Sequence, residues 1–218
     1  MEPAVVTRPA LAAELRAIAW PPVVAAAGAS GLLLVLDATV WPNGPGAVTA
    51  WLGVTLLTGA ACFALDQPAE DVVRSSPTTR AWRTAVRAGG GLVVLAVWAA
   101  YAVWWRSQLT FAVPSWWAQG LVGLSLVVLG LGLCAALVRR GRSEPAATVS
   151  GGLVFAVLAL GLVPVPGDVQ TLDLSGTRGS TTAFWVVVGA VGAVGLVWGS
   201  RDEGSRWRGP HTGPAVHR

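Results

Sequence analysis

The residues of this sequence whose types and spacing could do chemistry are concentrated in one polar segment, residues 66–87. The first half of the segment predicts a short helix that Asp66 or Gln67 caps, that begins at Pro68 and that ends before Pro77. Such an acidic helix can dock in a groove of a soluble partner and transmit the partner's movement to the rest of the chain. The alternative is a solvated connector, since charged helices in loops are common. The candidate docking residues are Asp66, Pro68, Glu70, Asp71 and Arg74.

The second half of the segment is basic and predicts a second helix, which Thr78 can cap. Its arginines follow one another at positions i, i+3 and i+7, with alanine, valine and one tryptophan between them. This pattern is typical of a helix that lies on an anionic leaflet, with guanidinium groups toward the lipid phosphates and the indole in the interface. The expected interfacial residues are Arg80, Trp82, Arg83 and Arg87.

The sequence contains few residues that could form other kinds of chemical site. All 15 basic residues are arginine, and without lysine the chain cannot form a Walker A phosphate loop. His211 and His217 are the only histidines, and both lie in a tail rich in proline and glycine. A catalytic triad, a zinc helix or a pair of haem ligands is therefore unsupported. We expect no enzyme activity, no bound metal and no cofactor in this chain itself.

The composition indicates that lipid is the solvent for most of the surface. The chain is 54% hydrophobic and only 12% charged, whereas soluble domains carry about 25% charged residues. The net charge of +4 does not indicate a nucleic-acid partner, because the arginines lie between long apolar runs. The expected partner of these runs is a lipid membrane.

Six uncharged runs approach or exceed the length of about 20 residues that a helix needs to cross a hydrocarbon core. The third run is the shortest, and the turn sequence of residues 41–46 separates the first two. The predicted fold class is all-α, a polytopic membrane helix bundle with six transmembrane helices. A cytoplasmic tail over residues 201–218 is expected to be disordered. The expected spans lie near 18–38, 47–66, 88–105, 117–138, 148–165 and 183–200.

The arginines predict the orientation of this bundle. If the N-terminus lies inside, the outer loops hold only Arg106 and Arg178, and the other 13 arginines are inside. Both termini are then cytoplasmic. Tryptophans gather at the predicted outer ends of the spans, where an indole suits the headgroup boundary. These tryptophans are Trp41, Trp104, Trp105, Trp116, Trp117 and Trp185.

Small residues in the spans leave two interpretations open. Helices in lipid associate through close backbone approach, which glycine permits. Glycine and alanine are also abundant throughout this chain, in a composition that suggests a genome rich in G+C. Cys62 and Cys134 both lie within apolar runs, and a disulfide between them requires the two helices to touch at the same depth. The glycines concerned are Gly120, Gly123, Gly130, Gly132, Gly189, Gly192 and Gly195.

The run Ala64-Leu65-Asp66-Gln67-Pro68-Ala69, followed by Ser76-Pro77-Thr78 and the arginines, resembles a pattern in actinobacterial ABC-transporter membrane proteins. In these proteins the second span ends in an LDDPA-like motif, from which Gln67 departs. The six-span plan also resembles ABC-2 type permeases. The resemblance assigns Leu11–Ile18 to an N-terminal amphipathic segment, Pro68–Arg74 to a coupling helix and Val165–Thr182 to an elaborated outer loop.

This resemblance implies a permease subunit of an ABC-type transporter, an exporter, in the plasma membrane of a bacterium. Its expected partners are an ABC ATPase subunit, which would bind ATP and Mg²⁺, and a second permease copy or a related permease. The absence of charges near the middle of any span agrees with a partner-driven permease, because ion-coupled transporters place ionisable residues inside the bundle. The alternative is a non-transporting membrane scaffold, immunity or signalling accessory subunit.

Overall fold

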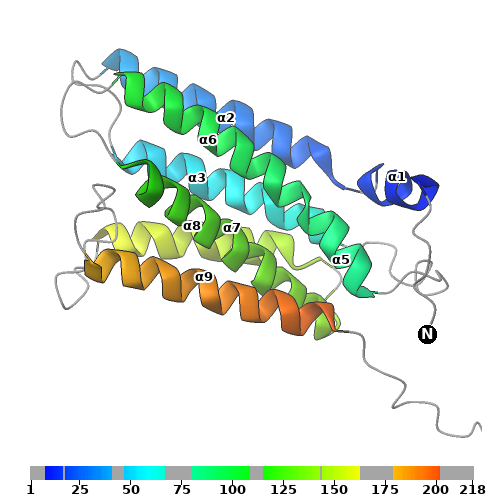
Figure 1. The fold of residues 1–218 in the computed structure, drawn as a ribbon. Helices are drawn as coiled ribbons and strands as arrows, with labels where there is room; N and C mark the ends of the chain where they lie inside the picture. The colour runs from blue at the N-terminus through cyan, green and yellow to red at the C-terminus, as the bar shows by residue number, and fades with distance from the viewer. Residues whose placement is uncertain are drawn as a thin grey trace, which may run out of the picture.

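In the computed structural model the chain forms a bundle of helices that run side by side (Figure 1). The structure describes residues 8–16, 18–40, 47–66, 80–108, 115–142, 144–162 and 179–201. Within these residues every regular element is a helix and there is no strand, which confirms the expected all-α class. The helices are α1 (Arg8–Arg16), α2 (Trp20–Val40), α3 (Ala47–Cys62), the short 3₁₀ helix η1 (Phe63–Leu65), α5 (Arg80–Ala88), α6 (Gly90–Gln108), α7 (Trp116–Arg139), α8 (Ala146–Leu162) and α9 (Gly179–Ser200).

Five helical stretches in the described part of the chain are long and apolar enough to cross a membrane. The span expected near residues 148–165 corresponds to α8, which has 17 residues and is shorter than the other five. The third run, the shortest in the sequence, is part of a longer stretch, because α5 and α6 join at Gly89 to form 27 helical residues. The five stretches are Trp20–Val40, Val48–Leu65, Ala81–Ser107, Trp116–Arg139 and Gly179–Ser200.

The helices α7 and α9 run parallel and form the closest pair in the bundle. Ser125 donates a hydrogen bond of 2.8 Å to the carbonyl of Trp185, and further along both helices Ala135 lies against Gly199. The helix α8, which lies against α3, follows α7 in the chain and precedes α9. It returns the chain to the end of the bundle at which α7 begins. As a result, α1 and the last turn of α9 lie at the same end of the bundle (Figure 1), which we call the α1 end.

Glycines determine how closely α7 and α9 approach. A Cβ atom on Gly192 would lie 2.5 Å from the Cα atom of Leu129, and one on Gly195 would lie 3.0 Å from the carbonyl oxygen of Gly132. These distances favour the packing interpretation of the glycines in both spans. Gly199, which was not among the glycines singled out from the sequence, lies four residues after Gly195 in a GxxxG pair and also contacts α7. In contrast, a Cβ atom on Gly120 would meet open space.

Two tryptophans expected at the headgroup boundary lie inside the bundle. Trp105 and Trp185 are only 3% and 2% exposed, so neither indole faces the lipid headgroups as the sequence suggested. The ring of Trp185 stacks on that of Trp51 from α3, with centroids 5.1 Å apart. Trp116 and Trp117, by comparison, are exposed as expected. Position near the end of a span therefore does not by itself place an indole in lipid, because the neighbouring helix can cover it.

The two cysteines approach each other as thiols. Cys62 on α3 and Cys134 on α7 are both fully buried and both free. Their thiols lie close enough to interact, which answers the question of depth that the sequence left open. Cys62 also donates a weak hydrogen bond to the carbonyl of Thr58, one turn earlier, at 3.4 Å. The pair therefore belongs to the packed contact between α3 and α7.

Candidate functional site

A buried ion pair joins two helices at the α1 end of the bundle. The Nε atom of Arg87, in the last turn of α5, donates a hydrogen bond of 3.0 Å to the Oε2 atom of Glu14 on α1. The two side chains are only 7% and 14% exposed. A charged pair at this burial is strongly constrained, because removal of either partner leaves an uncompensated charge. The position of Arg87 at the C-terminus of α5 also places its charge favourably against the helix dipole.

Two further hydrogen bonds extend this pair to α3 and α8. The Nη1 atom of Arg87 lies 3.4 Å from the carbonyl oxygen of Asp66, directly after the 3₁₀ turn that ends α3. The Oδ1 atom of Asp66 accepts a hydrogen bond of 3.0 Å from the backbone N–H of Ala146, the first residue of α8. We call Glu14, Asp66, Arg87 and Ala146 the Arg87 cluster. It ties α1, the end of α3, α5 and the start of α8 together.

The structure corrects the role expected for Arg87. The sequence placed it on an exposed face toward lipid phosphates, but Arg87 is 6% exposed and bonded within the protein. Trp82 and Arg83 on the same helix are half-buried, and Thr84 is buried. Arg80 begins α5, but its side chain lies outside the described residues. The burial follows from tertiary packing, since α1 covers the face of α5 that carries Arg87.

The structure also assigns Asp66 a role different from the expected cap. Asp66 or Gln67 was expected to cap a helix beginning at Pro68, which lies outside the described residues. The Asp66 carboxylate instead contacts α8, 80 residues later, and caps its first turn. No local pattern could have revealed this bond, because it depends on which helix lies beside the end of α3. The other expected docking residues lie outside the described residues. These are Pro68, Glu70, Asp71 and Arg74.

The Asp66 carboxylate follows the membrane-length stretch that ends at Leu65, and its surroundings raise its pKa. Burial is the main cause, because it disfavours the charged form; the charge of Glu144 adds to it, and the hydrogen bond from Ala146 opposes it. Folding more often lowers the pKa of a carboxyl group. When folding raises the pKa instead, the stability of the folded state depends on pH in the opposite direction. The folded state gains stability from this group as the pH falls below the raised pKa, and loses that gain as the pH rises through it.

We expect Asp66→Ala to lower the free energy of unfolding by about 1 kcal/mol, because it removes the cap of α8. Asp66→Asn keeps an oxygen that accepts the Ala146 N–H and removes the charge, so we expect it to match the wild type or exceed it slightly at neutral pH. Reversible unfolding in mixed detergent micelles measures both variants. Equal losses for the two variants would show that the carboxyl oxygen is not a helix cap.

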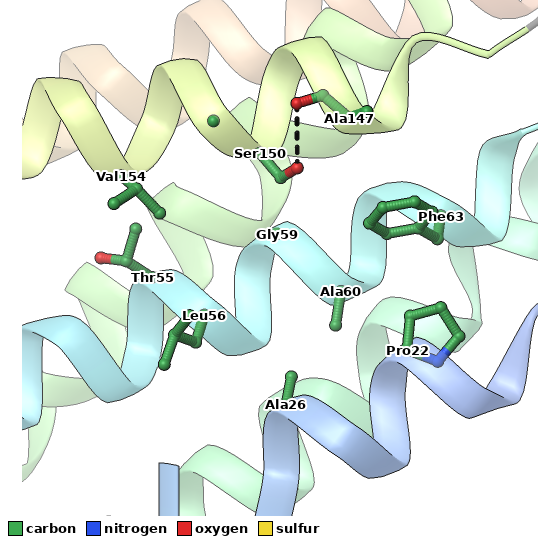
Figure 2. Close-up of a pocket in the computed structure, with 11 residues that line it drawn as sticks. Pro22, Ala26, Thr55, Leu56, Gly59, Ala60, Phe63, Ala147, Ser150 and Val154 are labelled. Atoms are coloured by element: carbon green, nitrogen blue, oxygen red, sulfur yellow. Dashed lines mark hydrogen bonds between the residues drawn. The ribbon is translucent and has the colours of Figure 1, made fainter. Parts of the chain in front are cut away.

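A groove of about 500 Å³ lies between α2, α3 and α8 (Figure 2). Its lining is mainly apolar, with Pro22 and Ala26 on one wall and Ala147 on the opposite wall. The two hydroxyl groups that line it are satisfied by their own helices. Thr55 donates to the carbonyl of Trp51, and Ser150 donates to the carbonyls of Ala146 and Ala147. Within the described part of the chain, the groove therefore offers apolar contact and no reactive group.

The Arg87 cluster can connect elements mechanically, but it contains no pairing of nucleophile and base. Its hydrogen bonds hold both ends of residues 66–87 in one place, so a force on this segment would reach four helices. No protein-family model, no curated protein and no solved structure matches this chain. The geometry of the cluster and the pattern of the sequence are thus the basis for a function.

Proposed function

We propose that this chain is the permease subunit of an ABC-type transporter, an exporter, driven by a separate ATP-binding subunit that docks on residues 66–87. The observation that carries the proposal is the Arg87 cluster. Asp66 begins the segment and Arg87 ends it, and the bond between them closes the segment at its base. A partner that moves the segment would therefore move its base as one unit rather than extend a loose connector.

The paths out of the cluster support the same proposal. From Asp66 the linkage continues into α3 along the chain and into α8 through the Ala146 N–H. From Arg87 it continues into α6 along the chain and into α1 through Glu14. A docking segment in an energy-coupled permease needs connections of this kind, because work done on the cytoplasmic side must reach the helices that enclose the substrate path.

We further propose that the bundle has six spans, with both termini in the cytoplasm of a bacterial cell and the α1 end inside. The parallel course of α7 and α9 supports an even number of crossings, because the chain must return between them, and α8 is the helix available for this return. The α1 end carries Arg87, Arg139 and Arg140, whereas Arg106 lies at the other end. That asymmetry agrees with the positive-inside rule.

Charge reversal in the segment tests the docking. We expect the double substitution Glu70→Arg and Asp71→Arg to abolish copurification of an ATPase subunit with this chain. Opposite charges steer and hold such a contact, and each reversed pair becomes repulsive. Affinity purification of the tagged full chain from its native host, followed by identification of the bound proteins and an ATPase assay, provides the measurement.

A matched control reverses two carboxylates in the predicted outer loop, Asp168→Arg and Asp173→Arg. This variant should retain the partner and its ATPase activity. The proposal fails if the wild-type chain brings down no ATPase. If the wild-type chain binds a partner but substrate flux in reconstituted vesicles is the same with and without this chain, the scaffold or signalling alternative is favoured instead.

A further inference from the structure

A second cluster at the α1 end surrounds Trp198, in the last turns of α9. Arg139 at the end of α7 donates a hydrogen bond to the carbonyl of Trp198, and its guanidinium carbon lies 4.6 Å from the centre of the indole ring. The guanidinium carbon of Arg140 lies 5.8 Å from the same ring. Stacked guanidinium groups are held in place at little entropic cost, and their outer N–H donors stay available.

The sequence positions these arginines by ending α7 sharply. Gly141 adopts a φ of +85°, a left-handed conformation that glycine adopts readily. The N–H of Arg142 then turns back to the carbonyl of Leu137, and Arg140 forms the C-cap. Because α9 is parallel to α7, Arg201 at its end lies at the same end of the bundle. Both helix C-termini favour the cations beside them.

An apolar groove of about 370 Å³ along α9 begins at this cluster. It is lined by Ala193, Val194, Val197, Trp198 and Arg201. Val194 and Val197 are 69% and 54% exposed, as expected of side chains in contact with hydrocarbon. Among the described residues of this lining, Arg201 carries the one charge, and it stands at the end of an otherwise apolar row of side chains.

We propose that this groove is a binding site for one anionic phospholipid. The headgroup phosphate would lie between Arg140 and Arg201, and an acyl chain would lie along Val197 and Val194. Both arginines are exposed, and neither forms an ion pair within the described part of the chain. Basic pockets between membrane helices on the cytoplasmic side recognise anionic headgroups in this way. A free phosphate group would use the arginines alone and leave the adjoining apolar groove without an occupant.

The test uses the delipidated full chain in dodecyl maltoside micelles and counts bound lipids by native mass spectrometry. Dioleoyl phosphatidylglycerol should bind with a saturable stoichiometry of one, and more tightly than dioleoyl phosphatidylcholine. The double variant Arg140→Gln and Arg201→Gln should bind phosphatidylglycerol about 25-fold more weakly, since each arginine near a headgroup contributes about fivefold. Glycerol 3-phosphate, which lacks acyl chains, should not compete.

Two variants keep the outcome decisive. The double variant Arg16→Gln and Arg106→Gln also removes two positive charges, but from positions outside the groove. This variant should bind phosphatidylglycerol like the wild type. Val194→Phe fills the groove without a change of charge and should weaken binding of phosphatidylglycerol. Equal binding of the two lipids, an unchanged affinity in the Arg140 and Arg201 variant, or competition by glycerol 3-phosphate would each overturn the proposal.

Discussion

Gly132→Ala is expected to lower the free energy of unfolding by about 3 kcal/mol, at the upper end of the usual range for overpacking. The new Cβ atom would lie 2.8 Å from the carbonyl carbon of Gly192 and closer still to its oxygen. Both atoms belong to the backbone of α9, so no side chain can rotate away. The pair of helices must separate instead, and the neighbouring contacts of Gly192 and Gly195 weaken with it. Reversible unfolding in mixed detergent micelles, followed by tryptophan fluorescence, measures the loss.

The matched control is Gly120→Ala in the same helix. A Cβ atom at Gly120 meets nothing within 4 Å, so only helix propensity changes, and alanine is favoured over glycine by about 1 kcal/mol. We therefore expect opposite signs for two identical substitutions in α7. If both variants stabilise the protein, the backbones of α7 and α9 do not approach each other as closely as described.

Arg87→Gln is expected to lower the free energy of unfolding by about 3 kcal/mol, because it leaves the Glu14 carboxylate partly buried without its partner. The variant also loses the bond to the Asp66 carbonyl, which closes residues 66–87 at their base. If the segment transmits the work of an ATPase, the variant should uncouple ATP hydrolysis from substrate flux in reconstituted vesicles, even at temperatures where it stays folded.

A double-mutant cycle separates the pair from the general loss of a charge. Glu14→Gln alone should also destabilise, whereas the double variant with Arg87→Gln should lose less than the sum of both, because no charge is then left unpaired. Arg16→Gln removes an exposed charge from α1 and should change the unfolding free energy by less than about 0.5 kcal/mol. Additive effects of the Glu14 and Arg87 substitutions would contradict the ion pair.

The two largest effects thus concern two different parts of the bundle. The glycine contacts hold α7 and α9 at a fixed separation, whereas the Arg87 cluster joins α1, α3, α5 and α8. In the proposed permease, the first would serve as a rigid body and the second as its connection to the partner. Changes at Arg87 should therefore affect both substrate flux and bundle stability, whereas changes in the contact between α7 and α9 should affect stability first.

Part of the candidate site could be predicted from the sequence. The sequence indicates both Asp66 and Arg87 as functional residues, at the first and last positions of the polar segment 66–87. The roles of these residues could not be predicted, because their partners are remote in the chain. Arg87 pairs with Glu14, 73 residues earlier, and Asp66 pairs with Ala146, 80 residues later. Spacing along one helix contains no information about such neighbours.

The sequence by itself determined the helical class and the positions of the apolar helices. A long apolar run must satisfy its own backbone hydrogen bonds in lipid, and a helix does so within the run, so composition and length are enough. The tertiary structure alone decided which faces meet. It buried Trp185 against Trp51, brought Gly132 against Gly192 and enclosed Arg87 beside Glu14. These outcomes depend on which helices are neighbours, and apolar helices in an apolar solvent have no hydrophobic stripe that indicates their neighbours in advance.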